Sequence, residues 1–333
     1  MTETIVSVVI PCYNEEKTIV QLLEAIRGQT YSIQKLEVVI ADALSQDRTR
    51  ERIGQYQQEH PELRIKVVDN PRRVIPAGLN LAIANSSGEF ILRMDAHAIP
   101  AADYVERCLA DLEAGLGANV GGVIDIKPGR ENWIGRSISV AAAHPLGVGD
   151  AYYRWATKPT EADTVAFGAY RRSLYDQVGK FDETLLANED YEWNTRVRAS
   201  GGRIWIDPSI RAVYYARPDL RSLAKQYFTY GFWKYRMLRR YPATLRWRQA
   251  LPPLFVLGIL MLLLFFAFWK LARIGLLVVA LLYTGILLAG TLKPAIREKR
   301  ISYLVGVPLA IMTMHFAWGA GFWWSMLKKG RTE

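Results

Sequence analysis

The chain has 333 residues, of which 50% are hydrophobic, and a formal net charge of +10. This length and apolar content exceed those of an ordinary single soluble domain, so we expect a globular domain followed by a more apolar part. Residues 1–210 carry 23 Lys and Arg against 29 Asp and Glu, and this negative balance excludes nucleic acid as a partner of the first part. The positive charge lies further on: residues 211–250 carry 10 basic residues against 1 acidic residue, and residues 251–333 carry 9 against 2.

The first residues, MTETIVSVVIP, contain neither a basic segment nor a signal-peptide cleavage site. We therefore expect the first 210 residues to stay in the cytoplasm. The two cysteines, Cys12 and Cys108, fit a reducing compartment and lack the spacing of a metal site. We interpret both as packing residues.

Four short runs rich in β-branched residues alternate with segments whose apolar residues recur every three or four positions. The runs are IVSVVI (5–10), LEVVIA (36–41), RIKVV (64–68) and EFILRM (89–94). This alternation predicts βαβ units and a mostly parallel sheet, and therefore an α/β domain. Open sheets of this kind bind ligands beyond the carboxyl ends of their strands, so we expect the site in the loops that follow the runs.

Carboxylate, amide and imidazole side chains follow three of the four runs. They are Asn14 and Glu15 after the first run, Asp42 and Asp47 after the second, and Asp95 and His97 after the fourth. One acidic residue at a strand end is often only a helix cap, and Asp47 stands directly before a helical pattern. Three such ends on one edge favour a binding site.

The usual glycine-rich phosphate loops are absent, since the chain has neither a GxGxxG nor a P-loop lysine motif. A divalent cation is the expected alternative for neutralising a diphosphate. Asp95 and His97 could reach one ion if the turn brings them together, and the pair favours Mn or Mg. A turn-capping Asp beside an ordinary His is the other interpretation of this pair.

Residues 5–235 resemble the inverting family 2 glycosyltransferases, whose catalytic domain has the Rossmann-like GT-A fold. The resemblance rests on SVVIPCYNEE (7–16), VVIADALSQDRT (38–49), NLAIANSSGEFILRMDAHA (80–98) and the segment 167–208, which contains NEDYEW (188–193). Within the family, DAHA, NEDYE and QYFTYG are most similar to the ExoA group of succinoglycan glucosyltransferases.

The resemblance implies a nucleotide site and a metal site. The residues expected to contact a uridine nucleotide are Pro11, Tyr13, Glu15, Asp42 and Asp95, with Asp42 facing the uracil edge. Asp95 and His97 occupy the positions that the family usually fills with the metal-binding Asp-x-Asp motif. The second Asp is replaced by His97, so the resemblance implies Mn or Mg without deciding between them.

The segment NEDYEW lies where the family keeps its general base. Attack on an anomeric carbon requires a carboxylate that takes the proton of the acceptor hydroxyl. The resemblance assigns this role to Asp190, with Glu189 in support, and implies inversion of the anomeric centre. The same residues also fit an ordinary helix start, with acids in the first turn and Arg196 and Arg198 in the last.

The segment LRSLAKQYFTYGFWKYRMLRRYP (220–242) mixes basic and aromatic residues. Such a mixture can bind single-stranded nucleic acid, but beside a membrane segment it is typical of an interfacial helix. The residues expected to bind the acceptor or lipid headgroups are Gln226, Arg236, Arg239 and Arg240. The segment lacks the Gln-x-x-Arg-Trp motif of processive polysaccharide synthases, which favours transfer of a single sugar.

Three long stretches after residue 250 carry no charge. They are 251–269, 274–292 and 301–327, and about 20 apolar residues cross a bilayer as a helix. Buried helices of a soluble core are the alternative. We therefore expect a cytoplasmic GT-A domain (1–215), an interfacial collar (216–250) and a membrane anchor (251–333) in a multi-pass protein of the inner or plasma membrane.

The third stretch poses a topological conflict. Basic residues between the second and third stretches favour a cytoplasmic loop, so a third simple span would place Lys328, Lys329 and Arg331 outside. The stretch contains Pro308 and could instead be kinked or re-entrant.

The combined expectation is a membrane-anchored glycosyltransferase. It would move one sugar, glucose or a related hexose, from a UDP-sugar to a polyprenyl-diphosphate-linked acceptor during exopolysaccharide or cell-surface glycan synthesis. Transfer to polyprenyl monophosphate and a non-catalytic membrane scaffold are the alternatives.

Overall fold

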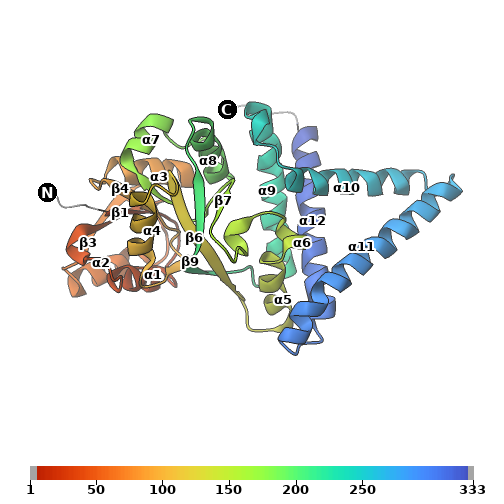
Figure 1. Cartoon of the computed structure of the whole chain (residues 1–333), viewed down its shortest axis with the longest axis horizontal. Coiled ribbons are helices and arrows are strands. Elements are labelled where there is room, and N and C mark those ends of the chain that lie inside the picture. Colours follow the sequence, from red (N-terminus) through yellow and green to blue (C-terminus); the bar gives the residue numbers. More distant parts are fainter. Residues whose placement is uncertain (1–5, 329–333) are drawn as a thin grey trace. The chain divides into compact units, whose positions relative to one another are not determined.

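The structure is a computed structural model and describes residues 6–328. The chain forms two compact units (Figure 1). The first contains the residues up to Asp125 together with Ala151–Tyr214, and the second contains Ile126–Asp150 together with the residues from Tyr215 onward. Residues 126–150 therefore fold with the C-terminal helices and not with the segments that flank them in sequence.

The strands form one sheet in the order β3-β2-β1-β4-β8-β6-β9-β5, with β7 paired to β9. Their bounds are β1 (Val6–Cys12), β2 (Leu36–Asp42), β3 (Arg64–Asp69), β4 (Phe90–Arg93), β5 (Ile99–Pro100), β6 (Asn119–Lys127), β7 (Thr160–Ala162), β8 (Ala169–Arg171) and β9 (Ile204–Tyr215). Strands β1 to β4 confirm the four predicted runs, apart from Ile5, which lies outside the described residues.

The sheet is mixed and mostly parallel. Strand β1 runs parallel to β2 and β4, and β2 runs parallel to β3. Strand β8 is antiparallel to β4 and β6, and β5 and β7 are antiparallel to β9. The parallel part is built from the predicted βαβ units, which confirms the α/β class. The carboxyl ends of β1, β2 and β4 consequently lie next to one another at one edge.

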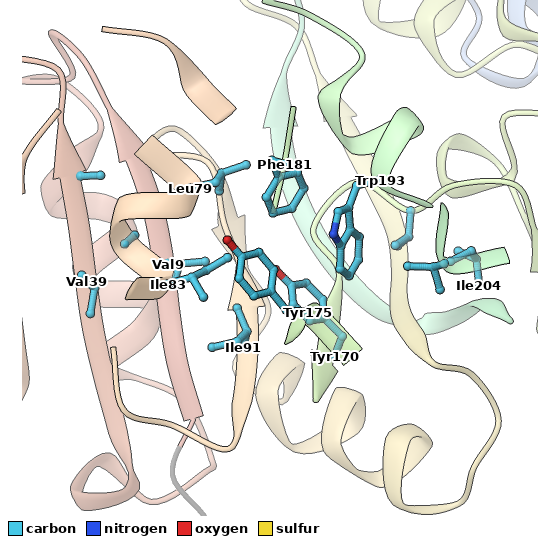
Figure 2. Close-up of a cluster of buried hydrophobic side chains, with 14 residues drawn as sticks. Val9, Val39, Leu79, Ile83, Ile91, Tyr170, Tyr175, Phe181, Trp193 and Ile204 are labelled. Carbon is cyan, nitrogen blue, oxygen red and sulfur yellow. The ribbon is translucent and has the colours of Figure 1, made fainter. Parts of the chain in front are cut away.

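Six helices belong to the first unit. They are α1 (Ile19–Arg27), α2 (Thr49–Glu59), α3 (Ile75–Ala84), α4 (Tyr104–Glu113), α7 (Arg172–Val178) and α8 (Glu189–Ala199). A buried cluster joins the strands to α3 and α8 through, among others, Val9, Ile91, Leu79 and Trp193 (Figure 2). The runs of β-branched residues are buried because both faces of a parallel sheet are covered.

The second unit is helical. Its elements are α5 (Trp133–Ala142), α6 (Pro145–Val148), α9 (Leu220–Arg240), α10 (Trp247–Leu264), α11 (Lys270–Arg297) and α12 (Tyr303–Leu327). Residues 6–328 also contain three short 3-10 helices: Ile33–Lys35, Tyr152–Arg154 and Pro242–Thr244. By length and composition, α10, α11 and α12 can each cross a membrane, which confirms the three predicted stretches. Helix α12 is unbroken from Tyr303 to Leu327, and Lys329 and Arg331 lie outside the described residues.

Candidate active site

The predicted nucleotide residues lie at the carboxyl ends of β1 and β2. Cys12, the last residue of β1, is in register with Asp42, the last residue of β2. Pro11 precedes Cys12 in β1, and Tyr13 follows it with an exposed ring. The two strand ends therefore form one continuous edge, as the parallel pairing requires.

The loops after β1 and β2 are tied together by hydrogen bonds. The backbone N–H of Asn14 donates to Ser45 Oγ at 2.9 Å, and the N–H of Glu15 donates to Thr49 Oγ1 at 2.7 Å. Asn14 adopts a left-handed backbone, with φ of 55°, which asparagine tolerates better than most residues. Asp47 accepts from the N–H of Thr49 at 3.0 Å, as expected of a residue that satisfies the start of α2.

Asp42 is fully buried and engaged by its own chain. Its carboxylate accepts from Arg50 Nε at 2.5 Å and from the Ser45 N–H at 3.0 Å. Arg50 also contacts Asp69, at the end of β3, at 2.5 Å. The uracil of a bound nucleotide could therefore reach Asp42 only by displacing one of these partners. The predicted contact between Asp42 and uracil stays a prediction.

His97 is oriented by a carboxylate. Its Nδ1 lies 3.0 Å from Glu15 Oε1, and Glu15 Oε2 accepts from Thr18 Oγ1 at 2.5 Å. Metal-bound histidines commonly show this pattern, in which one ring nitrogen is held by a carboxylate and the other faces the ion. Glu15, which the sequence predicts in the nucleotide site, therefore contacts His97, which the sequence predicts in the metal site.

The side chains at this edge fit a cation that is held partly by the protein and partly by the phosphates of a substrate. Among residues 6–328, no three His, Cys, Asp or Glu residues are grouped so that they could hold an ion by themselves. Mg and similar cations are commonly held by one or two carboxylates together with substrate phosphates. Asp95 could supply one such carboxylate, and His97, held by Glu15 at 3.0 Å, could supply a ring nitrogen.

Arg93 is the residue that sequence reasoning missed. It ends β4 and is buried, and its guanidinium lies 3.1 Å from Asp95 Oδ1, 3.4 Å from Glu189 Oε1 and 3.5 Å from Asp190 Oδ2. Burial alone would lower the pKa of Arg93, but the three carboxylates raise it, so the side chain is a fixed cation. The signal in the sequence is an arginine inside the otherwise apolar run FILRM, directly before Asp95.

The two acidic residues at the start of α8 differ in accessibility. The Glu189 side chain is 7% exposed, whereas that of Asp190 is 33% exposed. Burial and the charge of Asp190 raise the pKa of Glu189 to about 7. Burial also raises the pKa of Asp190, with Arg93 opposing this shift. Asp190 is therefore the carboxylate that a substrate can reach, and Glu189 is an inner partner of Arg93.

Helix α8 is held in place by an aromatic anchor. Trp193 is buried in the cluster of Figure 2, where its ring stacks on Phe181 with centroids 5.3 Å apart and tilts against Tyr170 at 4.6 Å. Its Nε1–H donates to the Gly179 carbonyl at 2.9 Å. Because Trp193 lies one turn after Glu189, this anchor fixes the start of the helix.

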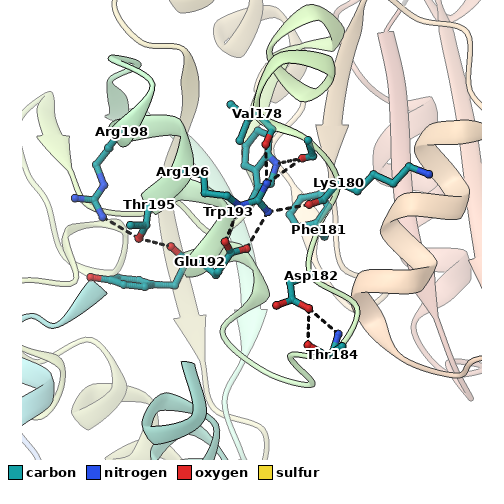
Figure 3. A network of polar contacts seen from close by, with 12 residues as sticks. Val178, Lys180, Phe181, Asp182, Thr184, Glu192, Trp193, Thr195, Arg196 and Arg198 are labelled. Atoms are coloured by element: carbon teal, nitrogen blue, oxygen red, sulfur yellow. Dashed lines mark hydrogen bonds and ion pairs between the residues drawn. The ribbon is translucent and has the colours of Figure 1, made fainter. Parts of the chain in front are cut away.

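A second anchor is ionic (Figure 3). Glu192 is buried and pairs with Arg196 Nε at 2.6 Å. Arg196 also donates to the carbonyls of Val178 at 2.7 Å and Lys180 at 2.8 Å, which lie in the segment before α8. The acidic and basic residues of NEDYEWNTRVR therefore do more than interact with the helix dipole. One of their pairs, Glu192 and Arg196, attaches α8 to the preceding loop.

The structure brings together some of the predicted site residues. Arg93 links Asp95 to Glu189 and Asp190, and Glu15 pairs with His97. The predicted acceptor residues are all on α9, in the second unit: Gln226, Arg236, Arg239 and Arg240. There, Gln226 donates to Tyr230 Oη at 3.1 Å, and Arg236 stacks on the Phe232 ring at 4.6 Å.

Several known proteins are similar to this chain in sequence or in fold. The family model described as "Glycosyl transferase family 2" matches residues 7–179. The succinoglycan biosynthesis protein ExoA of Rhizobium meliloti is 31% identical over 330 residues, which cover 98% of this chain and 96% of that protein. A Methanococcus voltae protein named dolichyl N-acetyl-alpha-D-glucosaminyl phosphate 3-beta-D-2,3-diacetamido-2,3-dideoxy-beta-D-glucuronosyltransferase is 27% identical over 333 residues, 98% of each chain.

Among solved structures, the mannosyltransferase PcManGT from Pyrobaculum calidifontis, in complex with GDP-Man and Mn2+, is similar with a TM-score of 0.63 and 22% identity. The likeness covers 92% of this chain and 86% of that one. These relatives confirm the GT-A fold and the predicted similarity to ExoA.

Proposed function

Because this chain belongs to glycosyl transferase family 2, we propose that it transfers one hexose, such as glucose, from a UDP-sugar to a saccharide carried on a polyprenyl diphosphate, with inversion of the anomeric carbon. One observation carries the proposal. A single buried cation, Arg93, contacts the carboxylate expected on the donor side, Asp95, and the carboxylate expected on the acceptor side, Asp190.

The chemistry follows from the accessibility of these groups. Asp190 accepts the proton of the acceptor hydroxyl while that oxygen attacks the anomeric carbon and the bond to the diphosphate breaks. Arg93 holds Asp190 by its Oδ2, and the Tyr191 N–H donates to its Oδ1 at 2.7 Å, so the carboxylate has a defined orientation. Attack from the side opposite the diphosphate inverts the centre, so an α-linked donor gives a β-linked product.

Asp95 and His97 would hold a Mn or Mg ion together with the donor's diphosphate. When bound, such an ion neutralises the diphosphate and makes it a better leaving group. Glu15 would orient His97 toward this position through the 3.0 Å contact with Nδ1.

The names of the relatives support a lipid-linked saccharide as the acceptor. One names succinoglycan biosynthesis, and the other names a dolichyl phosphate-linked sugar that is extended by a 3-β linkage. Both matches extend over the three apolar helices of this chain, which suit an acceptor carried in a membrane. Incubating the purified protein with a panel of nucleotide sugars and lipid-linked acceptors, followed by mass spectrometry of the lipid product, tests donor, acceptor and catalysis together. Absence of transfer with every donor would instead favour the non-catalytic scaffold.

Transfer is expected to require a divalent cation that His97 helps to hold. EDTA should stop the reaction and Mn should restore it, and His97→Ala should raise the Mn concentration for half-maximal rate by about 10-fold or more. The measurement is a Mn titration at saturating UDP-sugar, with His60→Ala as the matched control, since His60 contacts Glu24 and Glu62 on the surface. An unchanged titration curve for His97→Ala would leave His97 as an ordinary turn residue.

The arginines at the end of α9 are expected to bind the acceptor's charged headgroup. Arg239 and Arg240 are exposed, and a lipid diphosphate brings negative charge to the membrane surface. Replacing both with Gln should raise KM for the lipid-linked acceptor several-fold and leave KM for a short water-soluble acceptor analogue unchanged. Arg297→Gln, another exposed cation of the same unit, is the control. Equal effects on both acceptors would refute a headgroup contact.

A further inference from the structure

We propose that only α10 and α11 cross the lipid bilayer, as a hairpin, and that α12 stays with α9 on the face from which the hairpin enters. Length and composition alone treat α10, α11 and α12 alike. Their packing differs, however. The share of residues buried within the protein is 17% in the most apolar window of α10, 11% in that of α11 and 44% in that of α12.

Most side chains of the hairpin are apolar and exposed, and the buried ones, such as Val256 of α10 and Leu287 of α11, pack against α12. Figure 1 shows α10 and α11 leaving the pair formed by α9 and α12 and meeting at the segment 265–269. Exposed side chains along both helices include Leu260, Leu264, Leu277, Leu281 and Leu282. An apolar surface of this extent needs an apolar partner, and lipid chains are one. Helix α10, with 18 residues, is about 27 Å long, close to the thickness of the hydrocarbon layer.

The tip of the hairpin has the composition of a membrane interface. Phe268 is 87% exposed, and Trp269 and Lys270 follow it. Arg273 donates to the carbonyls of Phe266 and Ala267, both at 2.9 Å, and so satisfies backbone groups that the turn leaves unpaired. Tryptophan and basic residues favour the headgroup level, so the tip fits the far interface of the bilayer.

Helix α12 is joined to α9 by backbone-close packing. Gly231 of α9 lies against the Trp318 carbonyl of α12, and Gly321 of α12 lies against the Phe228 carbonyl of α9, so that a Cβ at either glycine would collide with the other helix. Rings of Tyr235 and Phe322 add an edge-on contact at 5.2 Å. If α12 crossed the bilayer, α9 would therefore have to cross it as well.

Insertion of α9 into the bilayer is unfavourable in free energy because the helix carries exposed cations. Lys225 is exposed and lies between Leu223 and Tyr227, which pack in the same cluster as Ala310, Ile311 and Met314 from the middle of α12. If α12 crossed the bilayer, Lys225 would lie near the bilayer centre, where a charged side chain strongly disfavours insertion. Arg221, one turn earlier, is also exposed.

The distribution of cations agrees with the hairpin. With two crossings, the loop between α11 and α12 and the end of α12 lie on one face, together with α9. That face then holds Lys293, Arg297, Lys299, Arg300 and Lys328. A third crossing would move Lys328 to the face of the tip. Collecting basic residues on one side is what the positive-inside rule favours.

Cysteine accessibility in the full-length protein tests the proposal. Single cysteines are introduced at Arg297, Lys328, Lys225 and Phe268 in a background with Cys12→Ala and Cys108→Ala. An impermeant maleimide is applied to right-side-out and to inverted membrane vesicles. We expect positions 297, 328 and 225 to react in the same vesicle orientation, and position 268 to react only in the opposite one.

Two results would overturn the proposal. Reaction of position 328 in the opposite orientation from 297 would show that α12 crosses. Reaction of position 268 in the same orientation as 297, or protection of the tip in both, would show that the hairpin does not cross. A second tip variant, Leu271→Cys, guards against a local folding defect, because Leu271 is also strongly exposed. None of these outcomes depends on which sugar, if any, the protein transfers.

Discussion

Replacing Asp190 with Asn is expected to lower kcat by about 10² to 10⁴ while binding of UDP is retained. An amide keeps the shape of the carboxylate and can still accept from Arg93, which lies 3.5 Å from Asp190 Oδ2, but it cannot take up the acceptor's proton. The measurements are the rate of sugar transfer to the lipid-linked acceptor and a calorimetric titration with UDP.

Two variants make this result specific. Asp176→Asn, on the exposed surface of α7, should transfer sugar at the wild-type rate. Glu189→Gln should have a smaller effect than Asp190→Asn, because Glu189 is the buried partner of Arg93 and its amide still accepts a hydrogen bond. A kcat for Asp190→Asn within about tenfold of the wild type would exclude Asp190 as the base.

Replacing Arg93 with Met should reduce both stability and activity. Removing one partner of a buried ion pair typically costs 3 to 5 kcal/mol of unfolding free energy, and here we expect about 3 kcal/mol because Glu189 can protonate instead. The side chains of Arg93 and Glu189 are only 10% and 7% exposed, so solvent screens the lost contact little. Unfolding in detergent measures the loss, and Arg171→Met, which breaks the exposed pair with Glu89, should cost less than about 1 kcal/mol.

The same substitution should change the pH dependence of catalysis. Arg93 holds down the pKa of both Glu189 and Asp190, so its removal should raise them further. A base with a higher pKa is deprotonated only at higher pH. The acidic limb of the plot of kcat/KM against pH should therefore shift to higher pH. Adding Glu189→Gln to Arg93→Met should recover part of the stability without restoring the rate. An unshifted acidic limb would mean that Arg93 only fills space.

The first half of the sheet could be predicted from local pattern. Strands β1 to β4 are buried runs of β-branched residues separated by amphipathic helices, and parallel pairing of neighbours follows from that order. The positions of Asp95 and Asp190 after β4 and at the start of α8 also followed from sequence. These features depend on residues that are close together in the chain.

The rest depends on distant partners. Nothing near Arg93 indicates that it contacts Glu189 and Asp190, which lie almost 100 positions later. Residues 126–150 look like a part of the first domain by position, yet Ile138 and Ala141 are buried with Val307 and Ala310. A similar limit applies to α12, whose apolar composition indicates a span but does not show that α9 covers one of its faces.

This distant pairing of α5 with α12 has a consequence for biosynthesis. The ribosome releases α5 long before α12, and at about 5 to 20 residues per second the interval is on the order of ten seconds. Throughout that time the face of α5 that carries Ile138 and Ala141 lacks Val307, Ala310 and the other α12 residues of its cluster, whereas β8 and β9 complete the sheet. Helix α12 therefore closes the second unit, and a nascent chain that stops before α12 leaves apolar surface for chaperones and proteases to recognise.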